Sequence, residues 1–588
     1  MTTSPLTRTR DRVPPHLRRF VVEQDYSAYD EIDQAVWRFI LLQTYSRLSS
    51  TAHPAYLQGL RQTGISRERI PRIAEMDACL GAYGWGAVAV DGFIPPRAFQ
   101  EFQALGIMTI AAKIRSSDHL AYTPAPDIVH ESAGHAPIVP DPKYREFLQC
   151  IGEIGSKAFS TPEDRSLYAA IHQLSEAKEN PAATTQEIDR STHALARAEA
   201  AVTSLSEAGM LSRLHWWTVE YGLVGTPDDY RIFGAGLLSS LGESHFCHDP
   251  SVEKRRLDRT CIHTGYDITR PQPQLFVAED FDHLKALLTE VADGLAQSVG
   301  GELAVARALA SEELATLELS TGLQISGVLS GVRGGPARRE YLQFSGPCTL
   351  GRDGQVLPGH QRDAHPEGYG TPLGRLDDGT ALSCLEEREL SRFAAGTNAR
   401  DLRLRYASGV EVSGRLVQTT LDSEGRLAVL TFENCRVVCG GDLLFDPAWG
   451  RYDMAVAEDV ASARAGGNDA GDWVQDASEL RSARCPQPPV RTEDDVLILA
   501  LYREALELWE SPESPGLVDR FELIDATLRE RFPHKWLLRW NLLECLYKIG
   551  RGGVLAATLR DELLAIEAER PDDLPISMGL RYLDERMA

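Results

Sequence analysis

Two histidines, His130 and His135, with Glu131 beside the first, have the residue types of a metal site. In the H-E-x-x-H pattern of zinc proteases the histidines lie about 40° apart around a helix, whereas five residues at about 100° each separate His130 from His135 by about 140°. The two side chains cannot meet from a straight α-helix. Gly134 can end a helix and Pro137 prevents its resumption, so we expect His135 to reach a metal from the helix end. The alternative is one hydrogen-bonded histidine at a helix end and one on the surface.

Glu220 is the third candidate ligand. It lies in the apolar, aromatic stretch 214–222, where an unpaired carboxylate would cost several kcal/mol, so it should face a metal, a proton or a cation. The alternative is a glutamate paired with an arginine. Two histidines and one carboxylate without a thiolate are typical of non-haem Fe(II) sites with open coordination positions. A shared site of His130, His135 and Glu220 would therefore favour redox chemistry over hydrolysis.

The elements that position these residues can be predicted from local patterns. Residues 87–90 form an apolar run typical of a short strand, a helix should start at about 97, and 109–114 reads as a second short strand. Pro124 and Pro126 disfavour a helix before Asp127, which is a suitable N-cap, so we expect a helix from Ile128.

The whole chain divides by composition and periodicity into several parts. We predict a polar leader (1–25) and a mainly α catalytic domain of helices with short strands (26–317), into which a helical hairpin is inserted at about 162–210. A β-rich domain (318–457), a linker (458–492) and a small helical C-terminal region (493–588) follow.

Charge and cysteine content limit the class of protein. The 588 residues include 61 Lys and Arg against 85 Asp and Glu, a formal charge of −24 that argues against binding to nucleic acid or anionic membranes. We see no signal peptide and no membrane-spanning segment, and the 10 scattered cysteines are not a disulfide framework. These observations favour a cytoplasmic protein, and they leave its oligomeric state open.

Three segments in order carry a family resemblance: Asp127–His135, Trp216–Leu223 and Gly234–Glu243. They resemble signature segments of the pterin-dependent aromatic amino acid hydroxylases, and weaker similarity extends from Tyr29 to Ala296. The chain is similar to the bacterial, phenylalanine 4-monooxygenase-like members, with a long C-terminal extension. The resemblance implies the hydroxylase fold for the catalytic domain.

The resemblance also implies roles for individual residues. His130, His135 and Glu220 fall on the iron ligands, and Arg115 falls on the arginine that binds the substrate carboxylate, with Asp127 as the acid that orients it. Trp216 is expected to stack on the substrate ring. Further pocket positions are Thr123, Gly236 and Ser239 for the amino acid, Phe99 and Glu131 for the pterin, and Ser240, Glu243 and His215 nearby. His215 departs from the family, which usually has tyrosine there.

The function implied by the resemblance is hydroxylation of an aromatic amino acid by O2 with Fe(II) and a tetrahydropterin. Ile268 lies where an apolar residue accompanies phenylalanine use, so conversion of L-phenylalanine to L-tyrosine is expected. The alternatives are hydroxylation of tryptophan, tyrosine or another ring position, a zinc hydrolase with Glu131 as base, and a catalytically silent interaction protein. The segment 359–365 contains His360 and His365; we interpret it as a loop with two incidental histidines rather than a further metal site.

Overall fold

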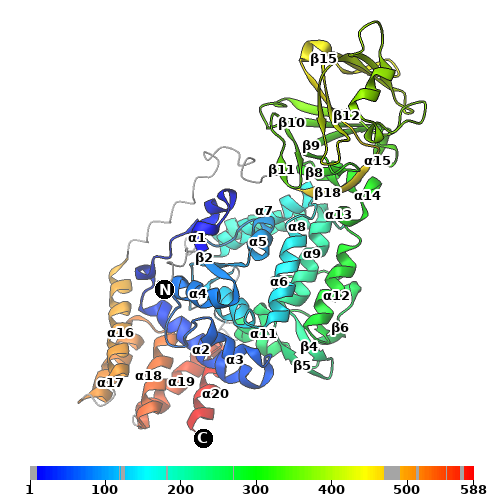
Figure 1. The fold of residues 1–588 in the computed structure, drawn as a ribbon. Helices are drawn as coiled ribbons and strands as arrows, with labels where there is room; N and C mark the ends of the chain where they lie inside the picture. Colours follow the sequence, from blue (N-terminus) through cyan, green and yellow to red (C-terminus); the bar gives the residue numbers. More distant parts are fainter. Residues whose placement is uncertain are drawn as a thin grey trace, which may run out of the picture.

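The computed structural model describes residues 9–117, 120, 126–179, 183–268, 271–468, 491–511, 515–550, 553–569 and 575–587 (Figure 1). Thr123 and residues 469–490 of the predicted linker lie outside the described residues. Within the described ranges, every helix is too short or too polar to cross a lipid bilayer.

Helices with two small sheets form the first part of the molecule. The helices are α1 (Thr9–Arg12), α2 (Glu31–Thr51), α3 (Ala55–Gln62), α4 (Ile73–Leu80), α5 (Pro96–Ala104), α6 (Pro142–Gly155), α7 (Pro162–Glu179), α8 (Thr185–Ala201), α9 (Glu207–His215), α10 (Ala235–Ser239), α11 (Leu241–Phe246), α12 (Phe281–Ala292), α13 (Ala296–Val299) and α14 (Gly301–Ser311). One sheet has the order β1-β2-β3 and the other β5-β4-β7-β6. Their strands are β1 (Val21–Val22), β2 (Gly86–Val90), β3 (Ile107–Ala111), β4 (Leu223–Thr226), β5 (Asp229–Ile232), β6 (Glu253–Arg256) and β7 (Gln274–Ala278).

Part of the predicted polar leader packs against the β1-β2-β3 sheet. Val13 and Leu17 are buried in one cluster with Val88 and Phe102, and β1 pairs antiparallel with β2. The leader prediction is therefore wrong from Thr9 onward, because the few apolar residues of this stretch cover the sheet.

Helix α2 is the central helix of this part. Asp30 caps it: its side chain accepts from the backbone N–H groups of Ile32 and Asp33, and the Asp33 side chain accepts from the Asp30 N–H in return. Buried residues occur along its whole length, and it contacts α10 and α11 on the site side and α16, α18 and α20 on the other. Helix α2 thus packs against both α10 and α11 and the C-terminal helices.

Two antiparallel sheets form the middle of the chain. The first has the order β11-β10-β9-β8-β18, with β12 also paired to β10, and the second has the order β13-β14-β15-β16, with β17 also paired to β15. The strands are β8 (Leu314–Leu319), β9 (Gln324–Arg333), β10 (Tyr341–Arg352), β11 (Gln355–Val356), β12 (Gly368–Pro372), β13 (Asp401–Arg405), β14 (Val410–Leu421), β15 (Leu427–Cys439), β16 (Asp442–Phe445), β17 (Tyr452–Ala455) and β18 (Val460–Ala465), with the short helix α15 (Gly335–Arg338). Figure 1 shows this part standing beyond α7, α8 and α14.

Strand β18 lies within the residues predicted as a linker. Residues Val460–Ala465 pair antiparallel with β8, so the linker prediction is wrong for them. The predicted boundary at 317 also cuts strand β8, which starts at Leu314. Small and polar residues made β18 look like a linker, and its pairing depends on a partner far away in the sequence.

The described C-terminal residues form helices α16 (Glu493–Glu510), α17 (Leu517–Arg531), α18 (Trp536–Ile549), α19 (Gly553–Glu569) and α20 (Ile576–Met587). They pack on α2 rather than on the sheets that precede them (Figure 1). Phe39 of α2 meets the rings of Trp536 and Trp540 edge-on, with centroids 5.0 and 4.7 Å apart, and Arg38 pairs with the buried Glu544.

Candidate active site

The two histidines converge because the helix that carries them widens. Residues His130–His135 form a π-helix, η4, whose backbone bonds span five residues, so that residues five apart lie above one another. His130 Nε2 and His135 Nε2 are 3.2 Å apart. The prediction that His135 reaches the site from a helix end was therefore wrong, although the two residues do meet. The expected separation of about 140° had assumed the 100° per residue of an α-helix, which does not hold in a π-helix.

Close packing against α10 accompanies this π-helix. A Cβ atom at Gly134 would lie 2.7 Å from the carbonyl oxygen of Ala235 and 3.1 Å from its Cβ, distances that a larger residue could not keep. Gly134 therefore serves close approach of the two elements rather than helix termination. At the other end, Asp127 Oδ1 accepts from the backbone N–H of His130 at 3.0 Å, as expected for the predicted N-cap.

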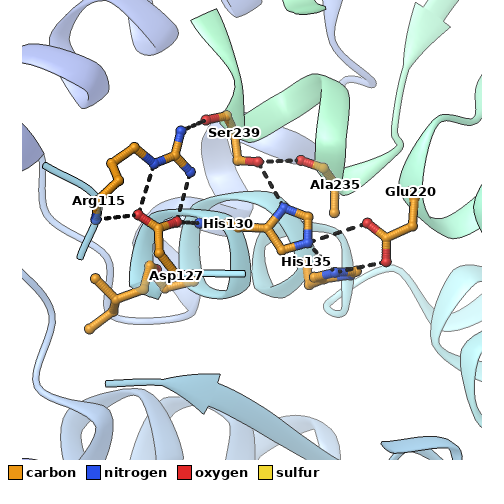
Figure 2. Close-up of polar contacts among 9 residues, drawn as sticks. Arg115, Asp127, His130, His135, Glu220, Ala235 and Ser239 are labelled. Atoms are coloured by element: carbon orange, nitrogen blue, oxygen red, sulfur yellow. Dashed lines mark hydrogen bonds and ion pairs between the residues drawn. The ribbon is translucent and has the colours of Figure 1, made fainter. Parts of the chain in front are cut away.

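Glu220 completes a cluster of three candidate ligands (Figure 2). It ends a second π-helix, η6 (Trp216–Glu220). Its Oε2 lies 3.3 Å from His130 Nε2, and its Oε1 lies 3.3 Å from His135 Nε2. Burial by itself raises the pKa of Glu220, but His135 and His130 beside it hold that pKa well below its usual range. Ligand atoms about 2.1 Å from an ion and about 100° apart are separated by about 3.2 Å, so the three groups fit around one metal.

Ser239 determines which nitrogen of His130 faces this cluster. The Ser239 hydroxyl donates to the carbonyl oxygen of Ala235 at 2.7 Å and lies 3.1 Å from His130 Nδ1. Since a hydroxyl has only one proton, Ser239 accepts from an Nδ1–H of His130. The lone pair is then on Nε2, toward Glu220, which is the tautomer a metal ligand needs.

Arg115 and Asp127 form a buried pair next to the cluster (Figure 2). Arg115 Nε and Nη2 donate to the two carboxylate oxygens at 2.8 and 2.7 Å, and Nη1 donates to the carbonyl oxygen of Ser239 at 3.3 Å. Burial raises the pKa of Asp127, but the charge and hydrogen bonds of Arg115 outweigh it and lower that pKa. Of the five N–H groups of the guanidinium, two have no partner among the described residues.

A cavity of about 1830 Å³ brings most of the predicted site residues together. A pocket for one drug-sized ligand has about 300–1,000 Å³, so this cavity has room for more than one small molecule. Its wall includes Phe99, Arg115, His130, Glu131, His135, His215, Trp216, Glu220, Gly236, Ser239, Ser240 and Ile268. Asp127 and Glu243 lie behind this wall.

The walls of the cavity also come from parts outside the helical core. Leu167, Tyr168 and Ile171 of α7 and Leu195 of α8 line it, so the predicted hairpin insertion lies over the site. Ser345–Pro347 and Arg362 of the β-rich part line it as well.

Trp216 is part of an aromatic stack. Tyr266 and Tyr221 stack on its ring with centroids 4.2 and 4.6 Å away and interplanar angles of 10° and 26°. Trp216 still lines the cavity, and its expected stacking on a substrate ring stays a prediction. Sequence reasoning missed both tyrosines; the aromatic ring of Tyr266 two residues before Ile268 was the available signal.

Gly236, Ser240 and Glu243 support this stack from α10 and α11. A Cβ atom at Gly236 would lie 2.9 Å from the Tyr221 ring, so only glycine leaves room for it. The Ser240 side chain caps α11 by accepting from the Glu243 N–H at 3.2 Å, and Tyr221 donates its hydroxyl to Glu243 at 3.4 Å. Burial raises the pKa of Glu243 to about 7.

Phe99, Glu131 and His215 line another side of the metal cluster. The rings of Phe99 and His215 meet edge-on with centroids 5.7 Å apart, and His215 Nδ1 lies 3.6 Å from Glu220 Oε1. Burial lowers the pKa of His215 to about 4 and raises that of Glu131 to about 8. Gln103, which sequence reasoning also missed, lies 3.3 Å from His215 Nε2. The binding roles of all these residues stay predictions.

The chain is similar to a family of known enzymes. The family model of the biopterin-dependent aromatic amino acid hydroxylases matches residues 23–167 and 192–302. The chain is 30% identical to the phenylalanine-4-hydroxylase of Ralstonia nicotianae over 269 residues, which are 45% of this chain and 72% of that relative. It is 29% identical to the enzyme of the same name from Pseudomonas aeruginosa, over 45% of this chain and 84% of the relative.

A solved structure is also similar to part of the chain. It is the phenylalanine hydroxylase of Chromobacterium violaceum with bound iron(III) and oxidized 7,8-dihydrobiopterin, which is 26% identical. The match covers 50% of this chain and 94% of that one, with a TM-score of 0.37.

Proposed function

Because this chain belongs to the biopterin-dependent aromatic amino acid hydroxylase family, we propose that it hydroxylates the ring of an aromatic amino acid, converting L-phenylalanine to L-tyrosine. The observation that carries the proposal is the convergence of His130, His135 and Glu220 on one point of a cavity that Arg115 also lines. Relatives named phenylalanine-4-hydroxylase support the choice of substrate.

The donor set fits Fe(II), with two imidazoles and one carboxylate on one side and the cavity on the other. Bound there, the iron and a tetrahydropterin supply the activation of O2 that ring hydroxylation requires. Ser239 holds His130 in the tautomer that binds the metal. Phe99 and Glu131 line the cavity on the side where we place the pterin.

Arg115 is the residue we propose for binding the amino acid carboxylate. Two of its N–H groups have no partner among the described residues, and a carboxylate can accept from both. The two hydrogen bonds that Nε and Nη2 of Arg115 donate to Asp127 keep the guanidinium plane in one orientation. A substrate held by its carboxylate presents its ring in a reproducible position, which is the protein's main contribution to the rate.

The choice of phenylalanine over other aromatic amino acids rests on the apolar Ile268 in the cavity wall as well as on the relatives' names. Tyrosine and tryptophan remain alternative substrates for the assay. A zinc hydrolase with Glu131 as base leaves the buried Arg115–Asp127 pair without a role. The cytoplasmic location stays a prediction, as does the oligomeric state.

The test uses the full chain with Fe(II) and a tetrahydropterin added without oxygen, followed by O2 and phenylalanine, tyrosine or tryptophan. We expect tyrosine from phenylalanine, with one oxygen atom from labelled O2, and no product from a Glu220→Gln variant. His534→Ala, which changes an exposed histidine of the C-terminal region, is the matched control and should keep full activity. Retention of zinc with no gain from Fe(II), or no hydroxylated product from any of the three amino acids, would contradict the proposal.

A further inference from the structure

A second group of potential metal ligands lies in the β-rich part, far from the candidate iron site in the sequence. His360 and His365 belong to the loop between β11 and β12, and Asp453 belongs to β17. Their ligand atoms all lie within 4.8 Å of one another. The sequence suggested two incidental histidines on a loop, but only 5% of His360 and 8% of His365 are exposed.

Both imidazoles direct a nitrogen at the same carboxylate oxygen without forming a hydrogen bond. His360 Nδ1 lies 3.7 Å and His365 Nε2 lies 3.6 Å from Asp453 Oδ2, which is beyond hydrogen-bond length. Neither buried nitrogen has a hydrogen-bond partner among the described residues. Buried polar atoms in folded proteins are rarely left in this state, so each nitrogen points to a missing partner.

The surrounding bonds hold the three groups in this arrangement. Thr431 donates its hydroxyl to Asp453 Oδ1 at 2.6 Å, which leaves Oδ2 turned toward the histidines. The loop is tied to β10 through its backbone: Cys348 N–H donates to the His365 carbonyl at 3.0 Å, and Leu350 N–H donates to the His360 carbonyl at 3.2 Å. The orientation of the site is thus established independently of any ion.

We propose that His360, His365 and Asp453 form a second metal site that binds a divalent transition-metal ion, with Zn²⁺ as the expected occupant. At a metal–ligand distance of about 2.1 Å, the two histidine–carboxylate separations of 3.7 and 3.6 Å correspond to angles of about 120° at the ion, closer to the tetrahedral arrangement of zinc than to a right angle. Two imidazoles and a carboxylate are one of the ligand sets of zinc, with water in the fourth position. The separations of 3.2 to 3.3 Å in the first cluster correspond to smaller angles of about 100°.

An ion at this position would join the two sheets of the β-rich part. The histidines precede β12, which pairs with β10 of the first sheet, whereas Asp453 lies on β17, which pairs with β15 of the second. The same loop carries Arg362, which lines the catalytic cavity. Metal binding would therefore hold one part of the cavity wall in place.

The test isolates this site by removing the other one. A full-length His130→Ala/His135→Ala variant, stripped with a chelator, is titrated with Zn²⁺ alone in competition with a chromophoric chelator. We expect one bound equivalent, and none after His365→Ala is added to the same background. His534→Ala in that background is the matched control, because His534 also lies 3.5 Å from a carboxylate but is exposed; it should keep the equivalent.

Thermal unfolding with and without Zn²⁺ is a second measurement of binding, for the case in which His365→Ala fails to fold. Zn²⁺ should raise the melting temperature of the His130→Ala/His135→Ala variant, since a ligand that binds only the folded state stabilises it. Asp453→Asn, which preserves the shape of the side chain, should abolish that rise. Absence of bound Zn²⁺ in the parent variant, or unchanged binding after loss of His365 or of the Asp453 charge, would overturn the proposal. Neither result depends on hydroxylase activity.

Discussion

Replacement of Ser239 by alanine tests the hydrogen-bond arrangement behind the candidate iron site. The change removes the acceptor at 3.1 Å from His130 Nδ1 and the donor at 2.7 Å from the Ala235 carbonyl, at a residue that is only 2% exposed. Among the described residues, no other group then favours the His130 tautomer with a lone pair on Nε2. Loss of such an outer-shell partner typically weakens metal binding about 10- to 100-fold, or about 1.4–2.7 kcal/mol.

Ser244→Ala is the matched control for this prediction. Ser244 is also buried, at 3% exposure, and its hydroxyl also donates to a backbone carbonyl, that of Leu241 at 3.0 Å, rather than bonding to a residue of the metal cluster. Both variants should lose about 1 kcal/mol of stability for the serine-to-backbone bond. Only Ser239→Ala should weaken binding of Fe(II) or Co²⁺, measured by competition with a chelator. Equal metal affinities in the two variants would refute the role assigned to Ser239.

Three further changes test the pair beside the cluster, the C-terminal helices and a buried acid. Asp127→Asn should destabilise the fold by about 3–5 kcal/mol in chemical unfolding, because the buried Arg115 charge loses its counterion; a loss below about 1 kcal/mol would contradict this. Trp540→Ala should cost about 3–5 kcal/mol by leaving a cavity against Phe39, and an unchanged melting temperature would show that the C-terminal helices contribute little to the common core. Glu243 has a pKa raised to about 7 by burial, so its contribution to stability is complete below about pH 4.5 and is lost as the pH rises through about 7. The melting temperature of the unchanged protein minus that of Glu243→Gln should therefore decrease between pH 5 and 8. A difference that stays constant over this range would argue against the raised pKa.

The family and the reaction could be identified from the sequence because three short segments retain both residue types and order. The order of a helix-rich part, a β-rich part and a helical C-terminal region was also predictable. Apolar residues repeat about every 3.6 residues in a helix and every 2 in a strand, and this spacing can be read locally. The hairpin of β14 and β15 follows from its turn, in which Gly425 has a φ of +80°.

Other features depend on contacts that local patterns do not contain. Strand β18 consists mostly of small residues, and its pairing with β8 is what makes it a strand. The rings of Tyr221 and Tyr266 come from different segments of the chain and stack on Trp216, which no local pattern indicates. His360 looked incidental because Asp453 and Thr431, which complete its surroundings, come from other strands.

The sequence by itself determined which residues are available for chemistry. His130, His135 and Glu220 are the candidate ligands, Asp127 caps the helix that carries the two histidines, and Arg115 is the cation beside them. Only the tertiary structure decided how they meet. In an α-helix, a separation of five residues would turn the two imidazoles away from each other. The π-helix brings them to the same side, and it lies where Gly134 packs directly on Ala235. The physical reason is that local preferences set the period of a helix, whereas close packing against a neighbour can change that period at one turn.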